Sequence, residues 1–324
     1  MTVAFVLGGG GVRGAVEIGM LRALLESGIR PDLVVGTSIG AINGALVASD
    51  PTPAVIDRLL GAWTSPAANA VYGDSLFAQF TRLVKTKTHL NSPAPLRHLL
   101  ERSLGADTRF EDLPVRLRVV AASIERAAEH VFESGPLIEA ILASASVPGL
   151  LPPTRIGDEH FIDGGIVNSI PIAQAVDAGA RTVFVLQVGR IETPLVAPRS
   201  AVDTARVAFE ITRRHRYARD VATLPEGVAL HVLPSGGGLD GDDALMSYRR
   251  MDTVRRRIDA AYDASLSFLA ERGLGAERSG DGLPSGDELP SGDDGARGAD
   301  ASVDDGARGA DASVDDGTRG KGAD

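Results

Sequence analysis

The sequence predicts an α/β protein in which helices cover both faces of a mostly parallel central sheet, a three-layer α/β/α sandwich. Short apolar segments alternate with helical patterns along most of the chain, as in proteins built from repeated βα units. Two apolar segments, Val34-Val35 and Val183-Phe184-Val185-Leu186, are continuous, which is typical of strands buried on both faces of a parallel sheet. The composition agrees with a globular protein, with 44% hydrophobic and 23% charged residues.

Helices are expected between the strands, among them Ala15 to Leu25 and Ala41 to Ala48. A further helix has Ser92 as its N-cap, Pro93 at its first position and Gly105 at its end. The expected strands are Val3 to Leu7, Leu33 to Gly36, Arg116 to Ser123, His130 to Glu133, His160 to Ile162, Thr182 to Val188 and Ala229 to Leu233.

A serine stands between glycines at the point where the second expected strand changes to a helix. Gly36-Thr37-Ser38-Ile39-Gly40 has the GxSxG pattern of a nucleophile elbow, a sharp turn that needs small residues at both glycine positions. The following helix points its N-terminus at Ser38, so the Ile39 N–H and the helix dipole can stabilise a developing negative charge. Because GxSxG also occurs in many proteins that are not enzymes, the motif alone does not decide the role of Ser38.

Four consecutive glycines lie between the first strand and the first helix. The segment Gly8-Gly9-Gly10-Gly11-Val12-Arg13-Gly14 exposes backbone N–H groups at a helix N-terminus, an arrangement that binds oxyanions or phosphates. Gly9, Gly11 and Gly14 also form the GxGxxG pattern of dinucleotide sites, so a nicotinamide or flavin enzyme is an alternative. The second strand ends at Ser38 and not at an acidic residue that would hold a ribose, which counts against such a cofactor.

Asp163 closes a short apolar segment and is followed by Gly164 and Gly165. Alone, Asp-Gly-Gly is ordinary turn chemistry. The chain, however, has a candidate nucleophile and a candidate oxyanion loop, but no motif that places a histidine beside Ser38. Asp163 is therefore the candidate base.

Together these segments resemble the patatin-like phospholipase family, whose members combine a glycine-rich loop, a GxSxG elbow and a later Asp-Gly-Gly or Asp-Gly-Ala. Residues Ala143 to Pro153 are similar to the Ala-Ser-x-Ser-x-Pro segment that precedes the aspartate in that family. The resemblance runs from about Thr2 to Val188. It implies a patatin-like acyl hydrolase domain over residues 1–276, with Ser38 and Asp163 as a catalytic dyad.

The activity implied by the resemblance is that of a serine acyl hydrolase for fatty acyl esters of phospholipids, lysophospholipids or related lipids, with no cofactor. Asp163 would take the Ser38 proton while Oγ attacks the ester carbonyl. A carboxylate with a pKa of about 4 is a poor base for a hydroxyl, so either burial raises the pKa of Asp163 or the proton transfer is concerted. The residues expected around the oxyanion are Gly9, Gly10, Gly11, Arg13, Gly14 and Ile39.

Two other kinds of protein are weighed against this hypothesis. A non-catalytic lipid-binding or regulatory protein of the same fold would have lost part of the site, whereas every motif residue is present. A hydrolase with a Ser-Asp-His triad would use His215 or His231, but in that fold several strands precede the serine, and here a single βα unit separates Gly10 from Ser38.

No catalytic metal is expected. The other four of the six histidines show no ligand spacing, and the sequence contains neither HExxH nor cysteine. Asp240, Asp242 and Asp243 lie in a glycine-rich segment, but they lack the spacing and the distal glutamate of an EF-hand, so a solvated loop is expected there.

Residues 277–324 are expected to form a disordered, acidic tail. An eleven-residue unit starts at Asp293 and again at Asp304, and its single valine cannot offset the entropy of ordering the chain. The tail holds 13 acidic and 5 basic residues, so residues 1–276 carry a formal net charge of only −2. With no cysteine, no apolar segment near the ~20 residues of a membrane span and no basic leader, a cytoplasmic location is expected.

The arginines of the domain are clustered. Such clusters attract anionic lipid headgroups, which allows peripheral contact with a membrane surface, but helix faces paired with acidic side chains are the favoured interpretation. Nucleic-acid binding is not expected, because the chain is acidic and offers no aromatic platform beside the arginines. The clusters are Arg213, Arg214, Arg216 and Arg219, and Arg249, Arg250, Arg255, Arg256 and Arg257.

Residues 51–92 interrupt the sheet pattern. Their large apolar side chains form either a lid or acyl-chain pocket, or simply part of the core, which is the commoner role of such residues. These side chains are Trp63, Tyr72, Leu76, Phe77 and Phe80.

Overall fold

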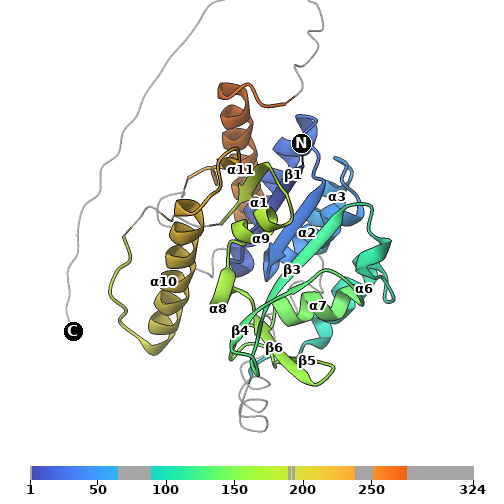
Figure 1. Ribbon diagram of the computed structural model, residues 1–324, viewed down its shortest axis with the longest axis vertical. Helices are drawn as coiled ribbons and strands as arrows, with labels where there is room; N and C mark the ends of the chain where they lie inside the picture. The colour runs from blue at the N-terminus through green and yellow to red at the C-terminus, as the bar shows by residue number, and fades with distance from the viewer. Residues whose placement is uncertain (1, 65–88, 189–190, 192–193, 238–250, 276–324) are drawn as a thin grey trace, which may run out of the picture. The chain divides into compact units, whose positions relative to one another are not determined.

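The computed structural model describes residues 2–64, 89–188, 191, 194–237 and 251–275 (Figure 1). Contacts along the chain group residues 1–278 apart from residues 279–324. The expected disordered tail, the Asp240 to Asp243 segment and Tyr72, Leu76, Phe77 and Phe80 lie outside the described residues, so these expectations stay predictions.

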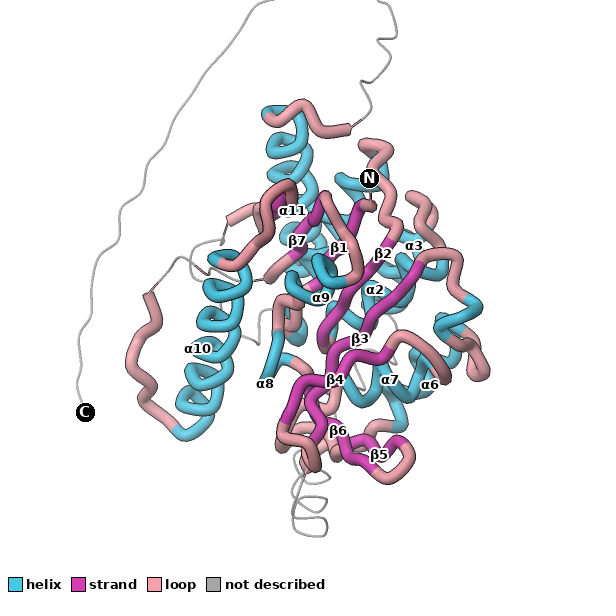
Figure 2. Tube along the Cα trace, viewed as in Figure 1, coloured by secondary structure: helices cyan, strands magenta, loops and turns pink. Residues whose placement is uncertain are grey.

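The described residues form an eight-stranded sheet in the order β5-β6-β3-β2-β1-β7-β8, with β4 paired to β3 (Figure 2). Strands β1, β2, β3, β7 and β8 are mutually parallel, and β4, β5 and β6 pair in antiparallel fashion. The strands are β1 (Val3–Leu7), β2 (Leu33–Thr37), β3 (Arg116–Ser123), β4 (Ala128–Phe132), β5 (Thr154–Ile156), β6 (Glu159–Asp163), β7 (Thr182–Leu186) and β8 (Ala229–Val232).

Helices cover both faces of this sheet, as the sequence predicts (Figures 1 and 2). A short 3₁₀ turn, η1 (Gly11–Gly14), leads into the first helix, and another, η2 (Phe110–Asp112), precedes β3. The helices are α1 (Ala15–Glu26), α2 (Ile39–Ser49), α3 (Val55–Thr64), α6 (Ala94–Leu104), α7 (Leu137–Ser144), α8 (Gly165–Asn168), α9 (Ile172–Asp177), α10 (Ala201–Ala222) and α11 (Met251–Glu271).

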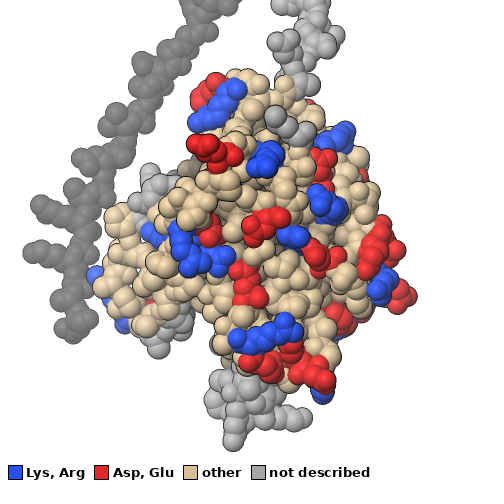
Figure 3. Space-filling view, in the orientation of Figure 1, with Lys and Arg blue, Asp and Glu red and all other residues tan. Residues whose placement is uncertain are grey.

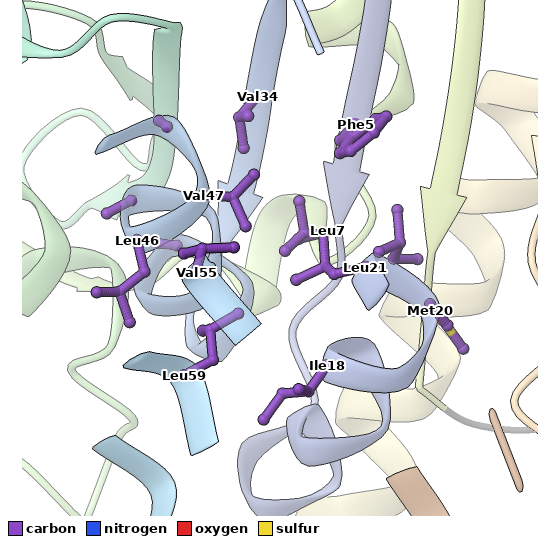
Figure 4. Close-up of a cluster of buried hydrophobic side chains, with 14 of the residues drawn as sticks. Phe5, Leu7, Ile18, Met20, Leu21, Val34, Leu46, Val47, Val55 and Leu59 are labelled. Carbon is purple, nitrogen blue, oxygen red and sulfur yellow. The ribbon is translucent and has the colours of Figure 1, made fainter. Parts of the chain in front are cut away.

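Alternate side chains of the central strands face two separate apolar cores. Phe5 and Leu7 of β1 lie among side chains of α1, α2 and α3 in the larger core (Figure 4). The same core includes buried residues of α6, α7 and α11. Ala4 and Val6 point to the opposite face, where they pack with α9 and with partly buried side chains of α10. Successive side chains of a strand point to opposite faces, so one apolar segment supplies both cores and both faces must be covered.

Helices α1 and α11 lie against each other at very short range in the larger core. A Cβ built on Gly19 of α1 would lie 2.1 Å from the carbonyl oxygen of Ile258 in α11. Because glycine has no side chain, the two helix backbones approach as closely as they do. The last described helix is thereby part of the same core as the first.

The structure corrects several expected boundaries. The strand expected to reach Val188 ends at Leu186, and α2 starts at Ile39, directly after Ser38, instead of at Ala41. Strand β5 was not expected, because a three-residue strand carries too little pattern to be recognised in sequence. Among the described residues, no helix is both long enough and apolar enough to cross a membrane.

Candidate active site

Ser38 occupies the sharp turn between β2 and α2. Its φ of 57° lies in the left-handed region, where a residue with a side chain is strained by about 1–3 kcal/mol. The turn is as tight as its sequence implies, since a Cβ on Gly36 would lie 2.4 Å from the Gly40 carbonyl oxygen. A Cβ on Gly40 would lie 2.2 Å from the Leu7 carbonyl oxygen. The flanking glycines therefore let the elbow sit against the end of β1.

The hydroxyl of Ser38 donates a hydrogen bond to the Asp163 carboxylate. Ser38 Oγ lies 2.6 Å from Asp163 Oδ2, and the Gly165 N–H donates to Asp163 Oδ1 at 2.7 Å. Ser38 is 7% exposed and Asp163 is 2% exposed. Burial raises the pKa of Asp163 to about 6, against the opposing effects of the hydrogen bonds from Ser38 and Gly165. The carboxylate is thus a stronger base than an exposed aspartate and is still mostly ionised at neutral pH.

The pairing pattern around β3 explains how two residues 125 positions apart in the chain meet. Strand β4 lies along one edge of β3, where Val120 pairs with Val131 and Ala121 with His130. On the other edge, β2 pairs with β3 as far as Val120, and antiparallel β6 takes over from Ala121, which pairs with Asp163. Strands β2 and β6 therefore end facing each other along one edge of β3.

The glycines after Asp163 allow this close approach. A Cβ on Gly164 would lie 2.2 Å from the carbonyl oxygen of Val120, and one on Gly165 would lie 2.9 Å from Asp163 Oδ1. The ring of Phe209 in α10 is the next neighbour of Gly165, at 3.3 Å from that Cβ position. Residues larger than glycine would push the short helix α8 away from β3 and would displace the N–H that holds Asp163.

The glycine loop lies directly beside Ser38, and its N–H groups divide into two kinds. The Gly8 and Gly9 N–H groups donate to Leu186 O at 2.9 Å and Ser169 O at 2.8 Å. The Gly10 and Gly11 N–H groups have no acceptor among the described residues. Among the glycines expected around the oxyanion, Gly9 is therefore not a free donor, because its N–H is already bonded. A Cβ on Gly9 would lie 3.5 Å from Ser38 Cβ, an ordinary contact, and 3.1 Å from Ser169 Oγ, a tight one.

The remaining expected oxyanion residues also separate by role. The Arg13 N–H donates to Gly10 O at 3.3 Å, so only the Arg13 side chain is available to a ligand. A Cβ on Gly14 would lie 2.5 Å from Ile39 Cγ1, which makes Gly14 a packing position between the loop and α2. The Ile39 N–H, at the start of α2, has no acceptor within the described part of the chain. Of the residues expected around the oxyanion, Gly10, Gly11 and Ile39 thus have N–H groups without an acceptor in the described part of the chain.

Ser144 and Ser146 support Ser38 and Asp163 by hydrogen bonds. In the sequence these two serines were noted only as part of the segment from Ala143 to Pro153 that resembles the family pattern. The Ser38 N–H donates to Ser144 Oγ at 2.8 Å, and that hydroxyl donates to Val120 O at 2.6 Å. The Asp163 N–H donates to Ser146 O at 2.9 Å. Ser144 and Ser146 stand in Ala-Ser-Ala-Ser-Val-Pro, so this segment was the available signal, although its contacts were not predictable from the pattern alone.

A buried polar network holds the far end of the glycine loop. Asn43 Nδ2 donates to Gly14 O at 3.1 Å and to Glu17 Oε2 at 2.8 Å, and its Oδ1 accepts the Trp63 indole N–H at 3.0 Å. Glu17 is fully buried, and burial raises the pKa of its carboxyl well above the ordinary value. Of the aromatic residues considered for a lid or pocket, Trp63 thus belongs to the packing behind the loop.

The histidines proposed for a triad lie elsewhere. The ring of His231 stacks on Phe184 with centroids 5.0 Å apart, and burial lowers the pKa of His231. His215 is an exposed residue of α10. The side chain that accepts the hydrogen bond of Ser38 Oγ is that of Asp163. Among the residues that the structure describes, no group of three His, Asp or Glu side chains could hold a metal ion.

The arginine cluster of α10 is not a uniform solvated face. Arg216 pairs with Glu129 at 3.2 Å and with Asp220 at 2.9 Å, as the favoured interpretation expects. Arg213, in contrast, is buried, with 6% of its side chain exposed. On the surface, acidic and basic side chains lie interspersed over the face shown in Figure 3.

The fold and the paired serine and aspartate define an α/β protein with a nucleophile elbow. The sequence profile described as Patatin-like phospholipase matches residues 5–176, more than half of the chain. The chain belongs to the patatin-like phospholipase family. This result agrees with the resemblance drawn from the four sequence motifs.

Known relatives are much longer than this chain. A patatin-like phospholipase domain-containing protein of Caenorhabditis elegans is 35% identical over 192 residues, which cover 59% of this chain and 14% of that protein. Lysophospholipase NTE1 of Candida glabrata is 30% identical over 199 residues, covering 60% of this chain and 11% of the relative. The structure of human GIVD cytosolic phospholipase A2 with Methyl gamma-Linolenyl Fluorophosphonate has a TM-score of 0.42 and 14% identity, over 84% of this chain and 58% of that one.

Proposed function

We propose that this protein is a serine acyl hydrolase that cleaves fatty acyl esters of lysophospholipids or phospholipids. The observation that carries the proposal is the 2.6 Å hydrogen bond from buried Ser38 Oγ to Asp163 Oδ2. The N–H groups of Gly10, Gly11 and Ile39, which have no acceptor among the described residues, add candidate donors for an oxyanion. Membership of the patatin-like phospholipase family and a lysophospholipase among the relatives favour a lipid ester as the substrate. We further propose a cytoplasmic location with transient contact to a membrane surface that presents the substrate.

The reaction would proceed through an acyl-enzyme. Asp163 accepts the Ser38 proton as Oγ attacks the ester carbonyl carbon, and the oxyanion of the tetrahedral intermediate accepts hydrogen bonds from the free N–H groups. Collapse of the intermediate breaks the bond to the alcohol, which leaves with the proton from Asp163. A water molecule, deprotonated by Asp163, then attacks the acyl carbonyl. When this second intermediate collapses, the bond to Ser38 Oγ breaks, Asp163 returns the proton to Oγ, and the fatty acid is released.

The hydrogen bond of Asp163 to Gly165 gives the base a fixed orientation. Because Oδ1 is held by the Gly165 N–H, Oδ2 is left to accept the proton from Ser38. The raised pKa of Asp163, about 6, brings the base closer to neutral pH, where a general base is most effective. No histidine is needed in this scheme.

The direct test is labelling with a fluorophosphonate probe together with hydrolysis of lysophosphatidylcholine. Wild-type protein should be labelled and active, whereas Ser38→Ala and Asp163→Asn should lose both labelling and at least about 1000-fold of the activity. The exposed variants Ser267→Ala and Asp263→Asn on α11 are matched controls that should behave like the wild type. Labelling that persists in Ser38→Ala, or a wild-type chain that is inert to both reagents, would contradict the proposal and favour a binding protein.

A further inference from the structure

Arg213 is the buried member of the arginine cluster on α10. Its side chain is 6% exposed, against 21% for the side chains of Arg214 and Arg216. A charged group is rarely buried to this extent unless its hydrogen bonds are made within the protein. The residue lies beyond the stretch 5–176 that matches the family profile, so its role is not described by that match.

The guanidinium of Arg213 binds the chain where it leaves the sheet. Nη2 donates to Gln187 Oε1 at 2.7 Å and to Val188 O at 2.8 Å, and Nη1 donates to Glu210 Oε1 at 3.3 Å. Gln187 and Val188 directly follow β7, the neighbour of β1 in the sheet. One side chain of α10 therefore anchors the first two residues after that strand.

Val188 in turn presses on the glycine loop. It is 1% exposed, and a Cβ built on Gly10 would lie only 1.9 Å from Val188 Cγ2. The isopropyl group thus lies against the Cα of Gly10 without a gap, and it occupies the space that any larger residue at Gly10 would need. The Gly10 N–H has no acceptor among the residues that the structure describes, and Gly10 follows Gly9, which lies against Ser38, so a shift of Val188 would be passed to a candidate oxyanion donor.

We propose that Arg213 is a positioning residue for the oxyanion-binding loop, acting through Val188 on Gly10. The inference rests on the proposed function, because the loop matters only if an oxyanion forms there. Hydrogen bonds from a buried cation are among the stronger ones in proteins, so the two that Arg213 donates to Gln187 and Val188 hold the residues after β7 firmly. A misplacement of about 1 Å in an active site can cost about 100-fold in rate, so loss of this anchor should be visible in catalysis.

The first test compares Arg213→Met with Arg219→Met, the same change at an exposed position of the same helix. Active sites are counted by exhaustive fluorophosphonate labelling, and kcat is expressed per labelled site. Arg213→Met should lower kcat per labelled site by at least about tenfold with little change in KM, and Arg219→Met should stay within about twofold. A merely structural role would lower the number of labelled sites and leave kcat per site unchanged, which would overturn the proposal.

A double-mutant cycle with Val188→Ala tests the route. If Arg213 acts through Val188, then Arg213→Met should cost clearly less in kcat when Val188 is already alanine. Equal costs in both backgrounds would overturn the route through Val188. Arg213→Lys keeps the charge but loses the forked donor geometry, so it should fold like the wild type and still show a reduced kcat per site. It supplies the result if the methionine variant does not fold.

A measurement independent of catalysis separates failure of this inference from failure of the proposed function. Amide hydrogen exchange of residues 8–14 should be faster in Arg213→Lys than in the wild type or in Arg219→Met. If the wild-type chain has no esterase activity, the proposed function fails, and this exchange difference still decides whether Arg213 holds the loop. Identical exchange in all three proteins would overturn the inference.

Discussion

At the scale of single residues, Asp163 has two constraints that work against each other. Its two oxygens accept hydrogen bonds from Ser38 Oγ and the Gly165 N–H, which favour the ionised carboxylate, while burial favours the neutral acid. Burial is the larger effect, and it raises the pKa to about 6. The same environment therefore makes the group a better base and makes its ionisation costly for the folded protein.

The pH dependence of hydrolysis should follow the ionisation of the Asp163 carboxylate. Only ionised Asp163 can accept the Ser38 proton, so kcat/KM should fall as the pH drops through about 6, by about tenfold per unit below it. A pH–rate profile between pH 4.5 and 8 on a soluble ester measures this. A profile that stays flat down to pH 4.5 would mean that Asp163 is not the base.

The stability of Asp163→Asn should differ from that of the wild type in a pH-dependent way. The folded-state pKa of about 6 lies above the reference value of 3.8, so the folded state binds the proton more tightly than the unfolded state. Wild-type stability therefore declines as the pH rises from about 4 to 6, by on the order of 3 kcal/mol. Above pH 6 the Asp163→Asn variant should melt at a higher temperature than the wild type, and the difference should shrink by pH 4. An unchanged difference across this range would contradict the raised pKa of Asp163.

Ser144 is expected to matter to both stability and activity. Ser144→Ala leaves the Ser38 N–H without its acceptor and Val120 O without its donor, which costs about 1–3 kcal/mol in a buried site. Because Ser38 is strained, loss of this support should also lower kcat by about tenfold. Chemical denaturation and ester hydrolysis, compared with exposed Ser267→Ala, measure the effect. If Ser144→Ala has the stability and the kcat of the wild type, the turn at Ser38 does not depend on the hydrogen bond to Ser144.

At the scale of elements, close packing between helices depends on single glycines. Gly19→Ala would place a methyl group 2.1 Å from Ile258 O and should destabilise the protein by about 1–3 kcal/mol by forcing α1 and α11 apart. Gly61→Ala is the matched control in α3, because outside the helix's own backbone no atom of the described residues lies within 4 Å of the added Cβ. It should stabilise the protein by about 0.5–1 kcal/mol through helix propensity. Urea unfolding of both variants measures this, and a neutral Gly19→Ala would show that the helices can separate at little cost.

At the scale of the whole molecule, α11 completes the main core. It contributes the buried side chains of Val254, Ile258, Ala261 and Leu269. A chain that ends at residue 276 should therefore keep its fold and its activity, whereas a chain that ends at residue 250 should expose α1 and lose cooperative unfolding. Circular dichroism melts and ester hydrolysis test both. Loss of activity in the chain that ends at residue 276 would show that the acidic C-terminal segment is needed for activity.

Most of the sheet and the first helices were predictable, since strands such as β1 and β7 are short, mostly apolar segments bounded by turns. The end of β7 at Leu186 instead of Val188 was not predictable. The apolar character of the segment cannot show that the Val188 carbonyl group is bound by Arg213. Hairpin β5–β6 was only half predicted, since three residues carry no usable periodicity. For the site, the elbow at Ser38 was predictable because its glycines obey local steric rules, but the bonded state of the Gly9 N–H depends on Ser169 O, far along the chain.

The sequence by itself determined the local devices: the glycine-flanked turn at Ser38, the row of glycines after β1 and the glycines after Asp163. Each follows from steric limits on a few neighbouring residues, and such limits act without the rest of the fold. Only the tertiary structure decided that Asp163 meets Ser38, because β2 and β6 end facing each other along one edge of β3. The raised pKa of Asp163 and the proposed support of the glycine loop by α10 through Val188 likewise depend on the tertiary structure. Both effects require segments that are distant in sequence to pack against each other.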